Sequence, residues 1–135
     1  MQSTRLQLVS VTPADTLDFD GKGKYSDPEY EWGETVGPTA LKFLNSDKLG
    51  KQYENDMFVG DFNNGIVYHF DLNKERKELD VDSALEGRVN EKIIFARGFG
   101  KITDIEVERD GYLYVVSINP SKIFRIVPQT TNQIQ

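Results

Sequence analysis

Short runs of β-branched and aromatic residues recur along this chain, and clusters of Gly, Asn, Asp and Pro separate them. Helical periodicity is scarce, so the pattern is typical of an all-β protein. Apolar and polar residues alternate within the runs, as in Thr39, Leu41 and Phe43, which share one face of an extended segment. The predicted strands are Thr39–Leu44, Met57–Asp61, Ile66–Leu72, Ile93–Ala96, Ile102–Val107, Tyr112–Ile118 and Lys122–Val127.

Three other segments are less regular. Arg5–Val11 alternates weakly and is a candidate for an eighth strand. The polar stretch that follows, Asp15–Pro28, is rich in Gly, Asp and Lys and is expected to be a long loop. Asp47–Asn55 is short and polar, and we expect a helical turn there.

Turn-forming residues link several of the predicted strands. Phe62-Asn63-Asn64-Gly65 separates two β-rich runs, and Asn-Gly predicts a hairpin because both residues tolerate a positive φ. Asp110-Gly111 and Asn119-Pro120-Ser121 mark two later turns. The chain is therefore expected to fold into antiparallel hairpins.

An internal repeat is the most informative feature of the sequence. Met57–Phe70 aligns with Leu113–Ile126, and apolar residues fall on apolar residues nearly throughout. The strand before each copy repeats as well, in residue type and in phase. The matched positions are Thr39, Leu41 and Phe43 in the first copy and Thr103, Ile105 and Val107 in the second.

Two copies of a strand-hairpin unit of roughly 50 to 60 residues match the blades of a β-propeller. A seven-stranded sandwich is the alternative, but it gives no reason for the pattern to recur in register. We therefore predict an all-β fold, a β-propeller fragment of about two four-stranded antiparallel blades. The predicted parts are an N-terminal strand and loop (1–24), two blades (25–128, divided into about 25–96 and 97–128) and a disordered tail (129–135).

The second predicted blade runs out of strands at Val127, so its outer strand is missing. Closed propellers often take that strand from the opposite terminus, and Arg5–Val11 could supply it or could end a preceding unit. Two blades alone leave open faces and strand edges. We therefore expect self-association, for example three copies in a six-bladed ring, or missing propeller blades.

Composition narrows the possible functions. The 135 residues suit one domain, and 16 Lys and Arg against 22 Asp and Glu give a net charge of −6, which disfavours a nucleic-acid partner. With no Cys and one His, thiolate and multi-histidine metal sites are excluded. No apolar run approaches the roughly 20 residues that span a bilayer, and the chain as given carries no signal peptide.

His69 shares a strand face with Val67 and Asp71, opposite to Tyr68 and Phe70. A lone strand histidine is usually structural or solvent-facing, and no Ser or Cys motif accompanies it, so we do not assign it a catalytic role. The sequence predicts no catalytic residue and no metal ligand.

Three loops offer polar groups for which turn chemistry is the simpler explanation. Asp18–Glu29 fits much of a twelve-residue calcium loop, but Lys22 stands where an oxygen ligand is needed. Asp61–Gly65 offers oxygens that a hairpin already explains. Arg97–Lys101 is basic and Gly-rich, but it lacks the spacing of a phosphate loop.

An aromatic stretch around Trp32 precedes the first repeat unit. Tyr25, Tyr30 and Pro38 accompany this tryptophan. Such clusters can stack on sugar rings, but aromatic residues in a loop more often cover the end of a sheet. We expect Trp32 to pack against the core.

Four blocks of residues give the chain a family resemblance. In order, they are Tyr25–Trp32 (YSDPEYEW), Val36–Ala40 (VGPTA), Tyr53–Asp61 (YENDMFVGD), and Ile102–Ile105 (ITDI) with Asp110–Tyr114 (DGYLY). Together they resemble the C-terminal blades of the glucose/sorbosone dehydrogenase family, from about Asp18 to Pro128.

That resemblance implies a six-bladed quinoprotein propeller that oxidises the anomeric carbon of an aldose sugar to a lactone. The implied cofactors are pyrroloquinoline quinone (PQQ) and calcium, and the catalytic base is a His in an earlier blade. This chain resembles only the last two blades, so it is expected to lack that base and to be inactive alone. Family members are typically periplasmic or extracellular. The alternative is a non-catalytic carbohydrate- or protein-binding propeller module.

The resemblance also suggests a cofactor contact. The family's late blades commonly aim a Lys in the penultimate hairpin, and an Arg-x-Arg before an Asp in the last blade, at the cofactor carboxylates. The corresponding residues here are Asn63, then Lys101 and Thr103 before Asp104. Lys101 alone keeps a positive charge, so it is the predicted cofactor-binding residue, and loss of the other cations should weaken binding of an anionic cofactor.

Overall fold

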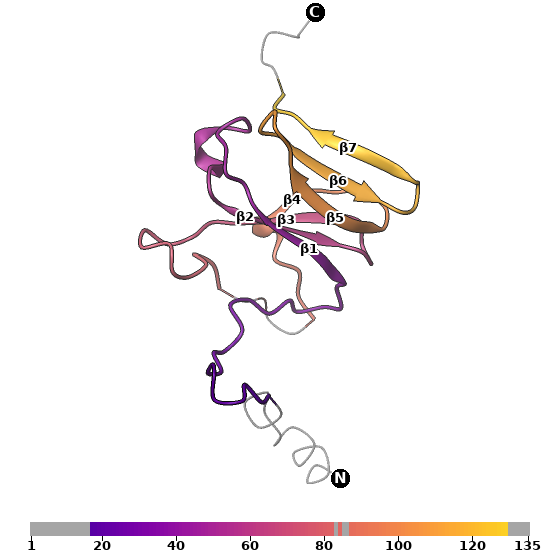
Figure 1. Cartoon of the computed structure of the whole chain (residues 1–135). Helices are drawn as coiled ribbons and strands as arrows, with labels where there is room; N and C mark the ends of the chain where they lie inside the picture. The colour runs from indigo at the N-terminus through magenta and orange to yellow at the C-terminus, as the bar shows by residue number, and fades with distance from the viewer. Residues whose placement is uncertain (1–16, 83, 85–86, 130–135) are drawn as a thin grey trace, which may run out of the picture.

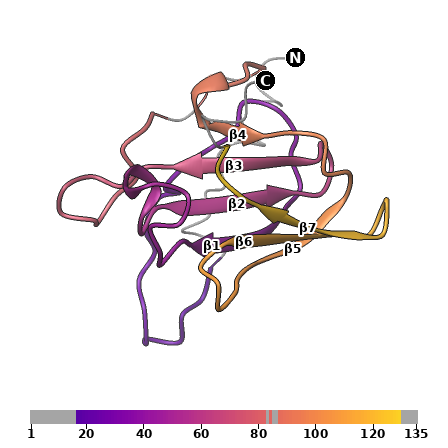
Figure 2. The ribbon, with the colours of Figure 1, turned by 90° about the horizontal axis from the view of Figure 1, so that it is seen from above.

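The structure is a computed structural model that describes residues 17–82, 84 and 87–129. Within these residues the fold is all-β, with two antiparallel sheets that lie against each other (Figures 1 and 2). The first sheet has the strand order β1-β2-β3-β4, and the second β5-β6-β7. The strands are β1 (Pro38–Phe43), β2 (Met57–Asp61), β3 (Ile66–Phe70), β4 (Ile94–Ala96), β5 (Ile102–Val107), β6 (Leu113–Ser117) and β7 (Lys122–Ile126).

Two single-turn 3₁₀ helices interrupt the connections, η1 (Lys51–Tyr53) and η2 (Glu91–Ile93). The seven predicted strands are confirmed to within one or two residues at their ends, where hydrogen bonding frays. β3 stops at Phe70 because Leu72 forms an isolated bridge with Leu79 instead. The predicted strand Arg5–Val11 lies outside the described residues.

The two sheets are copies of one unit in register as well as in sequence. Leu41 lies opposite Val59 in the first sheet, and Ile105 lies opposite Val115 in the second. The innermost pair of each sheet also carries an irregularity at the same place, between Pro38 and Ala40 and between Ile102 and Asp104. A shared bulge position is a feature of related units rather than of two strand pairs that resemble each other by chance. We therefore treat each sheet as one propeller blade.

The main core lies between the blades, where β5 packs against β1 and β2. Phe58 and Val67 from the first blade meet Ile105 and Val115 from the second, and all four are almost fully buried. Gly60 makes this approach possible, since a Cβ there would lie only 2.6 Å from Cγ2 of Ile102. The absence of a side chain at one position thus sets how closely the blades pack.

A second core covers the other face of the first blade. Val59, Tyr68 and Phe70 point away from the second blade, and Tyr30 and Trp32 from the segment before β1 pack over them. This confirms core packing for Trp32. Beyond this cover the face stays open, because Leu41 and Phe43 of β1 are about half exposed.

Gly60→Ala should destabilise the protein. The added methyl group overlaps Ile102 at the blade interface, and overpacking of this kind costs about 1–3 kcal/mol. Chemical denaturation measures the loss. Ile102→Ala in the same chain opens the space, so the two substitutions should be clearly less destabilising together than the sum of their separate effects. Strict additivity would show that Gly60 does not set the spacing.

Candidate functional site

The connections that the sequence associates with cofactor contact meet at one end of the blades. We call this the hairpin end: the segment 35–37 before β1, the β2–β3 hairpin (62–65), the β4–β5 connection (97–101) and the β6–β7 hairpin (118–121). Backbone hydrogen bonds join the four. The amide of Phe62 donates to Gly37 O at 2.7 Å, that of Phe99 to Gly65 O at 3.1 Å and that of Lys101 to Asn119 O at 3.0 Å.

Close backbone approach at this end depends on glycine. Gly100 has a φ of +79°, and a Cβ there would overlap the carbonyl oxygen of Asn119. That oxygen accepts a hydrogen bond from the backbone amide of Lys101. Gly65 has a φ of +68° in the first hairpin, and Ser121 takes the equivalent conformation, φ +64°, in the second. The two hairpins therefore share one turn geometry.

A buried carboxylate organises the first hairpin. Asp61 has no solvent-accessible surface and accepts hydrogen bonds from the backbone N–H of Gly37 (2.8 Å) and Asn63 (2.9 Å), the Asn64 amide (2.7 Å) and the Tyr68 hydroxyl (2.8 Å). Burial alone would raise the pKa of Asp61, but these donors outweigh it and hold the pKa below its usual value. Burial raises the pKa of the Tyr68 hydroxyl, and its hydrogen bond to Asp61 raises it further.

Lys101 lies at the hairpin end, over Phe62, the residue that precedes Asn63. The Lys101 ammonium lies 4.8 Å from the centroid of the Phe62 ring, and its side chain is exposed. Thr103 is less available, since its hydroxyl donates to the carbonyl oxygen of Val116 on the neighbouring strand at 3.3 Å. Lys101 and Asn63 thus both belong to the hairpin end, and the Thr103 hydroxyl is engaged within its own blade.

These residues fit only part of the clamp that a multiply anionic quinone needs. Lys101 offers one ammonium group, which already sits over an aromatic ring. Asn63 can offer only a neutral amide, and the Thr103 hydroxyl has a partner. Charge-assisted contacts are the strong ones for carboxylates, so the described residues of this end do not by themselves form a PQQ site.

A second polar cluster lies at the opposite end of β2 and β3. We call Asp56, His69 and Asp71 the His69 cluster. The His69 Nε2 atom lies 2.9 Å from Asp56 Oδ2 and 3.5 Å from Asp71 Oδ1. Asp56 is 5% exposed, and its burial raises its pKa, an effect that the hydrogen bond from His69 partly offsets. Arg76 approaches the other oxygen of Asp56 at 3.9 Å.

The sequence pattern located two of the three residues of this cluster. Alternation placed Asp71 on the face of His69, and the structure confirms their proximity. Asp56 was missed because it lies 13 residues before His69 in the sequence, just ahead of a different strand, β2. The signal was the hairpin register: Phe58 lies opposite His69, so the residue two positions before Phe58 shares that face.

The calcium-like loop is a solvent-exposed turn over its described positions. The amide of Asp20 donates to Asp18 Oδ1 at 2.8 Å, and the Lys22 ammonium lies 3.8 Å from Asp20 Oδ2. A cation therefore stands beside the carboxylate that would bind calcium. In the described part of the chain, the three side chains whose potential metal-ligand atoms lie within 4.8 Å of one another are those of the His69 cluster, and not those of this loop.

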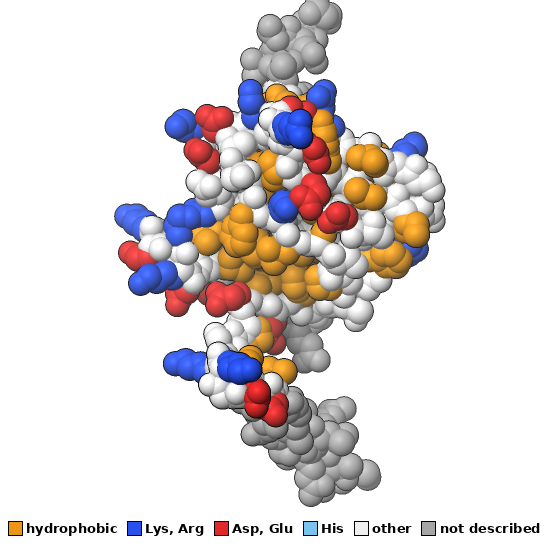
Figure 3. Space-filling model, in the orientation of Figure 1, with side chains coloured by type: hydrophobic (Ala, Val, Ile, Leu, Met, Phe, Trp, Pro, Cys, Tyr) orange, Lys and Arg blue, Asp and Glu red, His pale blue; other side chains and the backbone are white. Residues whose placement is uncertain are grey.

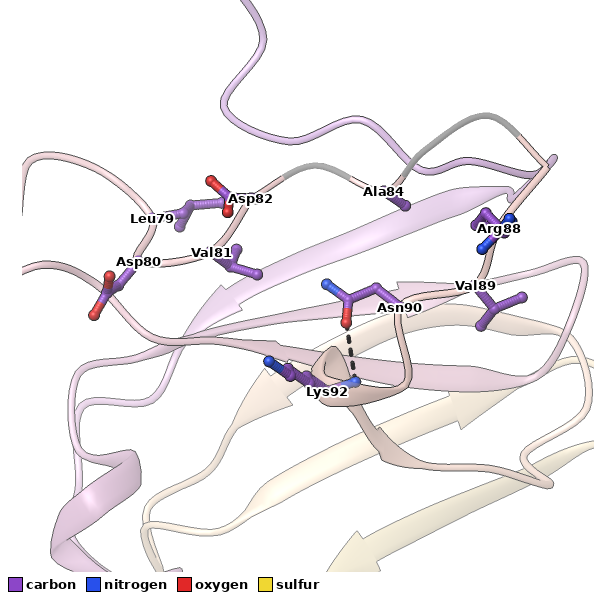
Figure 4. A pocket seen from close by; sticks show the side chains of 9 residues that line it. All are labelled: Leu79, Asp80, Val81, Asp82, Ala84, Arg88, Val89, Asn90 and Lys92. Carbon is purple, nitrogen blue, oxygen red and sulfur yellow. Dashed lines mark hydrogen bonds between the residues drawn. The ribbon is translucent and has the colours of Figure 1, made fainter.

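Two of the hollows on the first blade differ in polarity. One has a volume of about 620 Å³ within the β3–β4 connection, where two acidic and two basic side chains balance each other (Figure 4). The other is apolar, about 420 Å³, and lies between β1 and the aromatic cover of Tyr30 and Trp32. It adjoins the exposed Leu41, and Figure 3 shows a hydrophobic patch over this region of β1. The apolar hollow therefore continues an open blade face.

Comparison with known proteins agrees with this fold. The crystal structure of a proposed oxidoreductase (glucose dehydrogenase) from Thermus thermophilus is similar, with a TM-score of 0.51 and 23% sequence identity. The match covers 82% of this chain but 30% of that one, so the chain spans under a third of the length of this relative. No curated protein matches the sequence significantly.

The two blades and their shared register define the chain as a β-propeller fragment. A family model for glucose/sorbosone dehydrogenase matches residues 12–125. The chain therefore belongs to the glucose/sorbosone dehydrogenase family, whose members are generally PQQ-dependent. No helix in the described residues is long and apolar enough to cross a membrane.

Asp61 should make the stability of this end pH-dependent. Because its pKa is lower in the folded protein than in the unfolded chain, its contribution is full above about pH 4 and is lost as the pH falls through the folded value. Asp61→Asn should cost about 1.5–3 kcal/mol at neutral pH, since charged hydrogen bonds are lost.

Urea unfolding at pH 7 and at pH 3 measures both effects. The decrease in the free energy of unfolding caused by Asp61→Asn should be smaller at pH 3 than at pH 7. Asp82→Asn changes an exposed carboxylate in the β3–β4 connection and is the matched control. An equal loss at both pH values would show that the charge of Asp61 does not matter.

Proposed function

We propose that this chain is the late-blade part of a sugar-oxidising propeller, whose complete form oxidises an aldose to its lactone with PQQ. The chain contributes scaffold and one cation, Lys101, and does not supply the catalytic base. The family match supports the parent activity. The observation that carries the proposal is the position of Lys101, whose ammonium lies at the hairpin end over Phe62, the residue before Asn63.

A second function is favoured by the same residues. Asn63 and Thr103 are neutral at positions where the family commonly has cations, and the Thr103 hydroxyl is engaged with Val116. A propeller that no longer binds a quinone could keep its scaffold as a carbohydrate- or protein-binding module. The two functions differ in one property, which is whether the hairpin end faces a quinone.

Restoring the lost charges distinguishes the two functions. The chain itself should bind PQQ weakly, and Asn63→Lys combined with Thr103→Arg should strengthen binding at least tenfold, because each cation gains a charge-assisted contact with a carboxylate. Lys101→Gln in that background should reverse much of the gain. Equilibrium dialysis with PQQ, with and without calcium, measures the affinities.

The matched control is Lys74→Gln, which removes an exposed cation from the β3–β4 connection. It should leave the affinity unchanged. If the restored chain gains nothing, or if Lys74→Gln costs as much as Lys101→Gln, the hairpin end does not face a quinone. The non-catalytic module would then be the better description.

We further propose that the outer face of each blade packs against a neighbouring blade. In the 135-residue chain alone, other copies of the chain supply these neighbouring blades. On the first blade, Leu41 is 56% exposed. On the far face of the second blade, Ile123 is 73% exposed. Each face thus exposes a large apolar side chain where a propeller blade meets the next one.

Single charges should break this association. The contact uses two different faces, so Leu41→Asp and Ile123→Asp should each shift the chain to monomer. Phe19→Asp places the same charge on an exposed apolar residue of the loop before β1, outside the strands of both faces, and should not. Sedimentation velocity measures the species. A monomeric parent chain at all concentrations would exclude association through these faces.

A further inference from the structure

The His69 cluster brings together three potential ligands that no feature of the hairpin end uses. Asp56 directly precedes β2, His69 lies in β3, and Asp71 directly follows β3. Their ligand atoms all lie within 4.8 Å of one another. They belong to one hairpin ladder, in which the pairing of Phe58 with His69 aligns the three side chains on one face.

The spacing suits a small metal ion. Zn²⁺ binds imidazole nitrogen and carboxylate oxygen at about 2.0–2.2 Å, so neighbouring ligands of a tetrahedral ion lie about 3.3 Å apart. The separations of His69 Nε2 from the nearest oxygens, 2.9 Å to Asp56 and 3.5 Å to Asp71, bracket that value. One imidazole nitrogen facing two carboxylate oxygens can donate its proton to only one of them, whereas a cation binds all three.

The surroundings hold the imidazole in place. The rings of Tyr53, Phe58 and Phe95 surround it, with centroids 4.9, 5.2 and 6.4 Å from that of His69. Asp56 is buried, and the Asp71 side chain is 62% exposed. The cluster is thus fixed on its inner side and open to water on its outer side, where solvent can complete the coordination of the ion.

Arg76 is the described cation that borders this cluster. Its Nη1 atom lies 3.9 Å from Asp56 Oδ1, and its Nη2 atom donates to the carbonyl oxygen of Asn55. The guanidinium side chain is 43% exposed and faces the oxygen of Asp56 that does not contact His69. A metal ion and Arg76 would therefore approach Asp56 from different sides and repel each other.

We propose that Asp56, His69 and Asp71 bind a divalent transition-metal ion of the Zn²⁺ class. The imidazole ligand favours such an ion over Ca²⁺ or Mg²⁺, which prefer oxygen ligands alone. The ion links the β1–β2 connection to the end of β3, so its role is to stabilise the first blade. This site rests on the geometry of the cluster and not on the proposed function.

Titration of the metal-stripped chain with ZnCl₂ tests the site. Isothermal calorimetry should give one Zn²⁺ per chain, with a rise in melting temperature and at least tenfold weaker binding of CaCl₂. His69→Gln and Asp71→Asn should each weaken Zn²⁺ binding at least tenfold. Asp71→Asn changes a largely exposed side chain and keeps the test valid if His69→Gln fails to fold.

Two further variants separate a site from a structural ion pair. Asp82→Asn removes an exposed carboxylate from the β3–β4 connection, which also holds Asp71, and should leave Zn²⁺ binding unchanged. Arg76→Gln should tighten binding several-fold, because it removes the competing charge. Absence of saturable Zn²⁺ binding, equal affinity for Ca²⁺, or full affinity in Asp71→Asn would overturn the proposal. PQQ binding has no bearing on any of these outcomes.

Discussion

The close contact between the two blades is the constraint on which the rest of the structure depends. The buried apolar side chains of β2, β3, β5 and β6 form one core only because Gly60 lets Ile102 approach the backbone of β2. That contact fixes where β5 begins, and hence where Lys101 and the β4–β5 connection lie. Asp61 then fixes the adjacent hairpin from within. The hairpin end is therefore a product of packing and of one buried carboxylate.

The sequence predicted the fold well because the signals were local. Asn64-Gly65 marked a hairpin, and alternation around Leu41 and Ile105 carried both the strands and the repeat. Strand ends were less exact, since Leu72 continues the apolar pattern but pairs with Leu79 outside the sheet. The glycine at position 60 carried no such signal, because its role depends on Ile102, a residue 42 positions later.

The candidate sites were less predictable for the same reason. Lys101 could be singled out from its place in the chain, but only the structure shows that its ammonium lies over Phe62 and that the Thr103 hydroxyl is engaged. The His69 cluster needs the hairpin register, which brings Asp56 beside His69. Alternation within one strand could reach Asp71 and no further. A residue-by-residue pattern thus finds elements, whereas sites require the pairing of elements.

The contact between the blades also bears on the size of a closed ring. The Thr39 hydroxyl donates to Ile102 O at 2.7 Å across the junction, and the Lys42 ammonium pairs with Glu106 at 2.7 Å further along the same two strands. Together with Gly60 they fix the angle between one blade and the next. In a circular array that angle determines how many blades complete a turn. A substitution that widens this junction could therefore change the number of blades that close the circle as well as the stability of each pair.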